Sequence, residues 1–159
     1  MSDQVCVVVG GGKGMGAAIA REMKKRNYRL SLMSPSDNCE TLADELNGIA
    51  YRGRAENSRD TDNLIKFTME KFGRIDSLLI HVGGPPKGDL LEISEDDWKK
   101  ANEMVLMPVI RLSKLITPIM QSQGGGSIVN ITTFSVFEPS LMFPTCLLYT
   151  SDAADDWFC

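Results

Sequence analysis

Along the chain, short apolar runs typical of strands alternate with segments in which apolar residues recur with a helical period. Residues 5–9 form an apolar run rich in β-branched side chains, which is typical of a strand buried on both faces. From about residue 15 to residue 26, apolar side chains recur with a helical period. The alternation continues, and it predicts strands at residues 29–33, 50–55, 75–80 and 127–133 and helices at residues 39–47, 60–72 and 98–121.

The last predicted helix contains Pro108 and Pro118. It follows a capping box at residues 94–97, where side chains can satisfy backbone groups of the first helical turn. A proline inside a helix lacks the N–H that the helix needs, and its ring crowds the preceding turn. We therefore expect kinks, or a break near Pro108 that divides this helix into two segments.

Strands that alternate with helices are joined by right-handed crossovers, which place the strands in a parallel sheet with helices on both faces. The sequence therefore predicts an α/β fold. We expect a doubly wound parallel sheet. Ligands bind such sheets at the carboxyl ends of the strands, at the point where the strand order reverses.

Composition limits the partners and the compartment. The net charge of the 159 residues is −4 without a basic cluster, which argues against nucleic acid as a partner. No charged-then-apolar leader opens the sequence, and no apolar run approaches the ~20 residues of a membrane helix, so we expect no membrane association. The four cysteines lack the spacing of a metal site, which favours reduced thiols in a cytoplasmic protein.

The first apolar run ends in a glycine-rich turn that opens the first helix. Gly10 can make the tight turn off the strand, Gly14 lets a pyrophosphate approach bare backbone, and Gly16 lets the helix pack closely on the strand. The amides of the first helical turn, that of Met15 among them, can hold phosphates with the help of the helix dipole. The alternative is a glycine-rich turn without a ligand.

The end of the second predicted strand bears on the choice of nucleotide. An acidic residue there would hold the ribose 2′-hydroxyl of NAD, but Ser34 and the next two residues occupy this place. No carboxylate repels a 2′-phosphate, and Lys13 can pair with one. The cofactor prediction is therefore NADP rather than NAD. The alternative for Lys13 is a solvated lysine of the turn.

Several motifs together resemble the N-terminal part of the short-chain dehydrogenase/reductase family, from residue 1 to about residue 144. They are Gly10-x-x-x-Gly14-x-Gly16 and the segments at residues 72–78, 97–98 and 126–131. Val9 stands where the family usually has threonine. The resemblance implies a Rossmann-type doubly wound parallel sheet that is truncated here after the fifth strand. It also implies hydride transfer between NADP(H) and a carbonyl or alcohol substrate, in a homo-oligomeric parent protein.

The resemblance also implies roles for individual residues. The family's serine, which polarises the carbonyl, falls on Thr133 (or Thr132), and the adenine contact falls on Glu56 and Asn57. The cofactor-facing backbone of the family's Asn-Asn-Ala-Gly falls at His81, Val82 and Gly83. His81 is the single histidine of the chain, and we interpret it as a positional substitute for an asparagine rather than as a catalytic base.

The family's catalytic Tyr-x-x-x-Lys pair is missing from the sequence. Tyr149 is the one late tyrosine, and no lysine follows Lys114. A tyrosine without a neighbouring cation keeps a pKa near 10 and relays protons poorly at neutral pH. Val105 also replaces the asparagine that helps to position the lysine. We therefore interpret Tyr149 as non-catalytic and expect the chain as written to be inactive.

The end of the chain is the least protein-like part. Residues 146–156 are similar to a translated transposon-end adapter from sequencing-library preparation. This divides the chain into an incomplete NAD(P)-binding domain at residues 1–145 and a non-native tail at residues 146–159. The alternative is a natural acidic tail. Three functional hypotheses stay open: a truncated NADP-dependent carbonyl reductase, a nucleotide-binding family member without catalysis, or a polypeptide without a cellular role.

Overall fold

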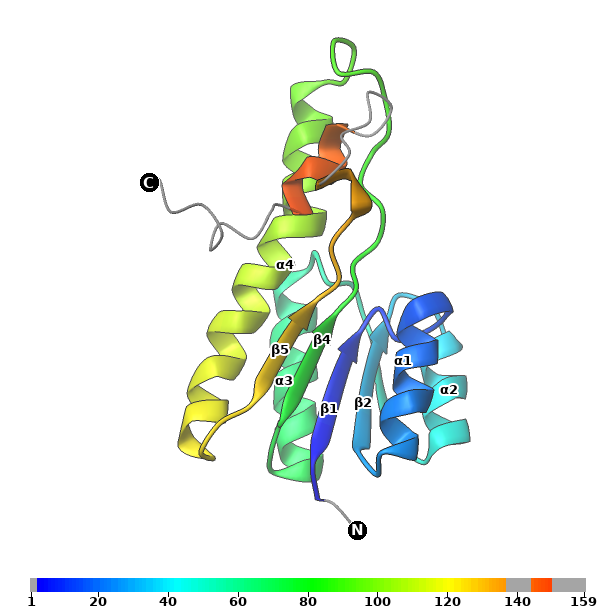
Figure 1. Cartoon of the computed structure of the whole chain (residues 1–159), viewed down its shortest axis with the longest axis vertical. Coiled ribbons are helices and arrows are strands. Elements are labelled where there is room, and N and C mark those ends of the chain that lie inside the picture. Colours follow the sequence, from blue (N-terminus) through cyan, green and yellow to red (C-terminus); the bar gives the residue numbers. More distant parts are fainter. Residues whose placement is uncertain (1–2, 137–143, 150–159) are drawn as a thin grey trace.

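Within residues 3–136 and 144–149, which the computed structural model describes, five parallel strands form one sheet in the order β3-β2-β1-β4-β5 (Figure 1). The strands are β1 (Val5–Val9), β2 (Arg29–Ser34), β3 (Ile49–Arg52), β4 (Ser77–Ile80) and β5 (Ser127–Asn130). Chain order reverses at β1, which pairs with β2 on one side and with β4 on the other. The predicted α/β class and doubly wound parallel sheet are confirmed.

Helices cover both faces of this sheet (Figure 1). They are α1 (Gly14–Lys25), α2 (Asn38–Leu46), α3 (Ser58–Phe72) and α4 (Glu95–Ser122), followed by the short 3-10 helices η1 (Phe134–Val136) and η2 (Pro144–Tyr149). Alternate residues of β1 face opposite cores, because Cys6 and Val8 pack with α1 and α2 while Val7 and Val9 pack with α3 and α4. Both faces of the central strand are therefore buried, as its unbroken apolar run predicts.

The predicted break in the last long helix is wrong. The helix α4 runs without interruption through Pro108 and Pro118. Its buried residues Val105, Leu112 and Ile116 follow a helical spacing that keeps one face of the helix on the core. Each proline removes one backbone hydrogen bond, and this packing outweighs that loss over a helix of 28 residues. Ser94 caps the start by accepting the N–H of Asp97.

Two predicted strands end earlier than expected. The third strand stops at Arg52. Gly53 N–H still donates to the Ser34 carbonyl of β2, but Arg54 N–H leaves the ladder because it donates to the Asp60 carboxylate. The fifth strand stops at Asn130, although Ile131 N–H still donates to the carbonyl of Ile80. The residues beyond Arg52 and Asn130 therefore belong to the loops at the carboxyl ends of the strands.

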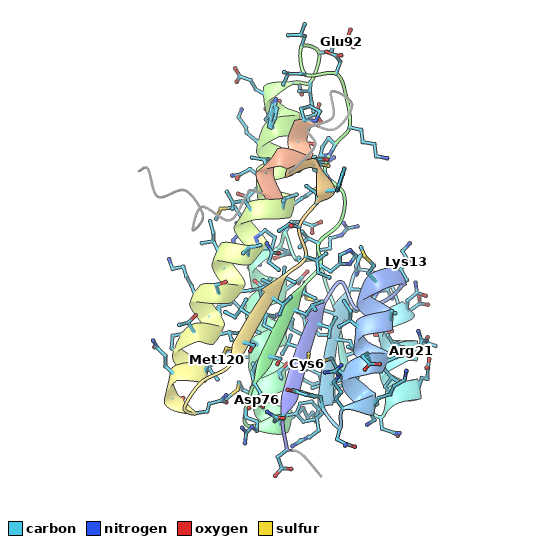
Figure 2. The ribbon with its side chains drawn as sticks, in the orientation of Figure 1. Cys6, Lys13, Arg21, Asp76, Glu92 and Met120 are labelled. Atoms are coloured by element: carbon cyan, nitrogen blue, oxygen red, sulfur yellow. The ribbon has the colours of Figure 1, made fainter. Side chains whose placement is uncertain are left out.

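Side chains fix the amino-terminal end of β4. The Asp76 carboxylate accepts the Val5 N–H at 2.7 Å and pairs with both Nε and Nη2 of Arg74. The Gln123 amide makes two hydrogen bonds with the backbone of Ile75, accepting its N–H at 3.0 Å and donating to its carbonyl at 2.6 Å. Figure 2 labels Asp76 at this lower edge of the sheet.

A projection rises beyond the carboxyl ends of the strands. It consists of the segment between β4 and α4, the first turns of α4, and η1 and η2, with Glu92 near its tip (Figures 1 and 2). Thr145 is buried there, and its hydroxyl donates to the Pro86 carbonyl at 2.6 Å. The expected boundary of the tail lies inside η2, and residues 150–159 of that tail lie outside the described residues. Among the described helices, none has the length and apolar character to cross a bilayer.

Candidate functional site

A cavity of about 360 Å³ opens at the carboxyl ends of β1, β2 and β4, where the strand order reverses. Its walls come from the glycine turn after β1, the segments after β2, β3 and β4, and one residue of α4. Residues from four separate loops thus meet at the place where open parallel sheets bind ligands. The predicted site residues that line it are Gly10, Lys13, Ser34, Glu56, His81, Val82 and Gly83.

The glycine turn is held between β2 and β4. The N–H groups of Gly10 and Gly11 both donate to the Met33 carbonyl at 2.9 Å. Gly10 has a φ of +80°, and a Cβ added there would collide with the backbone carbonyl oxygen of His81. A Cβ added at Gly16 would likewise collide with the carbonyl oxygen of Gly10. These two glycines therefore let strand, turn and helix pack at backbone distance.

The start of α1 is open. Gly14, its first residue, has a φ of +56°, and a Cβ added there would have no atom within 4 Å. The capping residue Lys13 makes no side-chain hydrogen bond to the helix, and the first turn holds no acidic residue. Met15 is exposed beside it. The helix thus presents its positive end to open space next to Lys13, which lines the cavity (Figure 2 labels Lys13 there).

The end of β2 carries no carboxylate. Ser34 is buried, and its hydroxyl donates to the Ser36 carbonyl at 2.9 Å. The backbone of Gly12 approaches Ser34 so closely that a Cβ at Gly12 would stand 2.5 Å from the Ser34 hydroxyl oxygen. The segment at residues 34–36 therefore lies directly beside the glycine turn and forms one wall of the cavity.

The segment after β3 is braced by ion pairs and hydrogen bonds. Arg54 Nη1 pairs with Glu56 Oε1 at 3.0 Å. From α4, the Arg111 guanidinium donates to the Glu56 carbonyl at 3.0 Å and pairs with Glu103 at 2.6 Å. Asn57 does not line the cavity, because it is the N-cap of α3 and its side chain accepts the Arg59 N–H.

Of the other predicted residues, some line the cavity and some do not. His81 lines the cavity near Gly10, and its backbone N–H donates to the Val9 carbonyl at 3.0 Å. Thr133, which lies just before η1, does not line the cavity. Its side-chain oxygen accepts the backbone N–H of Ser135 at 3.3 Å. Gly14 lines a second, shallower hollow between α1 and α2, while Met15 and Gly16 line neither.

Sequence reasoning missed Arg54 and Met104, which also line the cavity. The signal for Arg54 was available, because it follows the strand next to β2, and residues just beyond neighbouring parallel strands share one edge of the sheet. Met104 gave no such signal. Its position depends on where α4 passes the sheet edge, which is a matter of tertiary packing.

Comparison with known proteins identifies relatives for most of the chain. The sequence profile of a family described as short chain dehydrogenase matches residues 4–146. An uncharacterized oxidoreductase of Thermotoga maritima is 31% identical over 134 residues, which are 82% of this chain and 53% of that protein. A 7alpha-hydroxysteroid dehydrogenase of Bacteroides fragilis is 30% identical over 142 residues, or 84% of this chain and 55% of that protein. The chain spans about half the length of these relatives.

Solved structures share the fold. One is YwfH, described as an NADPH dependent reductase involved in bacilysin biosynthesis, with a TM-score of 0.86 and 20% identity over 93% of this chain and 62% of that chain. Another is L-sorbose reductase from Gluconobacter frateurii in complex with NADPH and L-sorbose, with a TM-score of 0.85 and 20% identity over 94% and 59% of the respective chains. The predicted Rossmann-type fold is confirmed.

Proposed function

This chain belongs to the short-chain dehydrogenase family of oxidoreductases, and from this premise we propose that its cavity binds NADP(H) in preference to NAD(H). The parent protein transfers hydride between that cofactor and a small carbonyl or alcohol substrate. The observation that carries the proposal is the end of β2, where Ser34 and the next two residues bring no carboxylate to the cavity wall, while Lys13 lines the same cavity.

The residues present fit a dinucleotide. The space above Gly14 leaves room for a pyrophosphate against the backbone, and the first amides of α1, including that of Met15, can donate to it. Gly10 and Gly16 keep that helix end against the strand. Glu56 would border the adenine end, and the backbone at His81, Val82 and Gly83 would border the cofactor farther along.

Catalysis needs groups that the residues described by the structure do not bring to the cavity. When bound, the nicotinamide supplies or accepts the hydride. Thr133 would supply the hydroxyl that polarises a carbonyl, but in this structure its oxygen accepts the N–H of Ser135. The sequence holds no Tyr-x-x-x-Lys pair. We therefore propose that the 159-residue chain binds the nucleotide and reduces no carbonyl.

A second candidate function is nucleotide binding without catalysis in the parent protein as well. Val105 supports this candidate, because it is a buried apolar residue of α4 at the place of the family's lysine-positioning asparagine. We further propose that residues 1–145 form the NAD(P)-binding domain, that residues 146–159 are a non-native tail, and that the parent protein is a homo-oligomer.

A cytoplasmic location is also proposed. Cys6 and Cys39 are free and buried, and burial raises the pKa of the Cys6 thiol to about 12. The Cys6 thiol therefore stays protonated and unreactive. Free thiols are typical of proteins in a reducing compartment.

Fluorescence titration of the chain with NADPH and with NADH tests the cofactor proposal. NADPH should bind more tightly. Lys13→Ala should narrow the difference by about fivefold, the effect of an exposed ion pair worth ~1 kcal/mol. Lys25→Ala, which changes an exposed lysine at the other end of α1, should leave both affinities unchanged. Equal affinities in the unsubstituted chain would refute the NADP preference.

The catalytic part of the proposal is tested by nicotinamide absorbance over a panel of carbonyl substrates. The 159-residue chain should give no turnover, while the uninterrupted gene product should give turnover if it carries a tyrosine with a lysine four residues later. Turnover by the 159-residue chain that Tyr149→Phe abolishes would show that the tail takes part in catalysis.

A further inference from the structure

The turn at residues 34–36 is contacted from two sides by backbone that carries cations. On one side, Gly12 approaches the Ser34 hydroxyl, and Lys13 is the next residue. On the other side, Gly53 donates its N–H to the Ser34 carbonyl at 3.0 Å, and Arg54 is the next residue. Both cations line the cavity, so Lys13 and Arg54 flank the end of β2.

The backbone under Arg54 is held in place while its guanidinium stays accessible. The Asp60 carboxylate accepts the Arg54 N–H at 2.8 Å, and Arg111 of α4 holds the Glu56 carbonyl. The Arg54 side chain itself is 65% exposed, and its partner Glu56 is 32% exposed. An ion pair this accessible to water contributes little and is exchanged readily for a stronger partner.

Charge decides what that partner is. Among the described residues that line the cavity, Lys13, Arg54 and Glu56 are those with a formal charge at neutral pH. Glu56 neutralises Arg54, so a doubly charged anion beside Ser34 would compete with this one carboxylate for the guanidinium. A phosphate offers more acceptor oxygens and more charge than a carboxylate, and arginine binds it with two parallel hydrogen bonds.

We infer that Arg54 is a specificity-determining residue that exchanges Glu56 for the 2′-phosphate of the bound nucleotide, so that this phosphate lies between Lys13 and Arg54. Glu56 then holds Arg54 when the ribose carries no phosphate, which reduces the attraction for other anions. The inference rests on the proposed nucleotide site. It adds a second cation, from the segment after β3, to the one on the glycine turn.

Calorimetric titration of the full chain with adenosine 2′,5′-bisphosphate and with AMP isolates the phosphate contact from the rest of the dinucleotide. Arg54→Ala should weaken binding of the bisphosphate about fivefold and leave AMP unchanged. Arg54→Lys should recover part of the loss, because it keeps the charge without the bidentate geometry. Glu56→Gln should raise the ratio of bisphosphate affinity to AMP affinity. Arg26→Ala, which removes an exposed arginine paired with Glu22, is the matched control and should change neither ligand.

The outcomes separate this inference from the function on which it rests. If Lys13→Ala removes the preference for the bisphosphate and Arg54→Ala does not, the NADP proposal stands and the role of Arg54 is refuted. Equal losses for both ligands in Arg54→Ala would make Arg54 a structural residue of the loop and would also refute the inference. If the unmodified chain binds neither ligand, the proposed function itself fails, and the inference fails with it.

Discussion

At the scale of single residues, Gly10 and Gly14 show two different physical reasons for the same residue type in one turn. Gly10 lacks room, because a Cβ would meet the His81 carbonyl, and its φ of +80° is unfavourable for other residues. Gly14 has a φ of +56° but ample room, since no atom lies within 4 Å of the position that a Cβ would take. Space at Gly14 is therefore available to a ligand, whereas space at Gly10 is filled by the fold.

Alanine substitutions should separate these two cases. Gly10→Ala should lower the free energy of unfolding by about 3 kcal/mol or more, because strain and overpacking add. Gly14→Ala should cost only about 1 to 2 kcal/mol of left-handed strain, yet it should weaken nucleotide binding because the methyl lies where a pyrophosphate approaches. Urea denaturation and fluorescence titration measure the two effects. Equal stability losses, or full nucleotide affinity in Gly14→Ala, would contradict this division of roles.

The ionised carboxylate of Asp76 stabilises the fold, and this stabilisation is lost at acid pH. Burial raises the pKa of this carboxyl, but hydrogen bonds from Arg74 and from the Val5 amide outweigh burial, so the pKa is lower than in the unfolded chain. The stabilisation is thus fully present above the ordinary aspartate pKa of about 3.9 and is lost as the pH falls from there through the folded value. Asp76→Asn should lower stability by about 1 kcal/mol at pH 7.

Asp76→Asn should also make the free energy of unfolding depend less on pH in the acid range. Between about pH 4 and pH 2, the free energy of unfolding of Asp76→Asn should decrease less steeply than that of the unsubstituted chain, because one depressed carboxyl pKa is gone. Urea denaturation at a series of pH values measures both slopes. Parallel curves that differ only by a constant offset would mean that Asp76 contributes through geometry and not through its charge.

At the scale of elements, periodicity predicts the number and order of strands and helices but not the details that depend on tertiary contacts. The run at residues 5–9 is apolar throughout, and the structure buries it on both faces. The third strand is shorter than its sequence suggests, because the Arg54 N–H donates to the Asp60 carboxylate and not to β2, and the composition does not reveal this contact. The predicted break at Pro108 is wrong because core packing on α4 exceeds the local cost of a proline.

The candidate site shows the same limit. Gly10 and Lys13 belong to the glycine turn, whose position follows from its motif, and both line the cavity. Counting along the chain places Asn57 at the adenine, but its side chain completes the start of α3. Arg54 could be placed at this edge of the sheet from its position after the strand next to β2, but a charged residue after a strand is common. Only the contact of Gly53 with Ser34 shows how close Arg54 lies to the end of β2.

The two prolines of α4 lead to a prediction at this scale. Pro118 is exposed, so Pro118→Ala restores a backbone donor to the Lys114 carbonyl without opening a cavity. It should raise the free energy of unfolding by about 2 kcal/mol, since the unfolded chain also gains some freedom. Pro108 is buried, so Pro108→Ala should gain less because it also leaves a void. Urea denaturation decides, and an equal gain at both positions would contradict the role of burial.

At the scale of the whole molecule, β5 lies at an edge of the described sheet. It pairs with β4 alone, and Ile128 and Val129 are 38% and 50% exposed. An edge strand with exposed β-branched side chains is a template for pairing with another chain. The 159-residue chain should therefore self-associate in a concentration-dependent manner.

Sedimentation velocity on two lysine variants tests this expectation. Val129→Lys should shift the chain toward the monomer, because a charge on an edge strand opposes pairing. Ile110→Lys changes an apolar residue of similar exposure on α4, away from the edge, and should have a smaller effect. If both variants reduce self-association equally, general surface hydrophobicity rather than the edge of β5 is responsible.

The pairing of Gln123 with Ile75 gives the end of α4 a measurable signature. Its side-chain amide imitates a peptide group and occupies both the N–H and the carbonyl of Ile75. Ile75 is completely buried, but its N–H is protected by a side chain rather than by a neighbouring strand. Deuterium should therefore enter the Ile75 amide whenever the last turn of α4 frays, well before the amides of β1 exchange. This one proton reports how often helix and sheet separate at the base of the molecule.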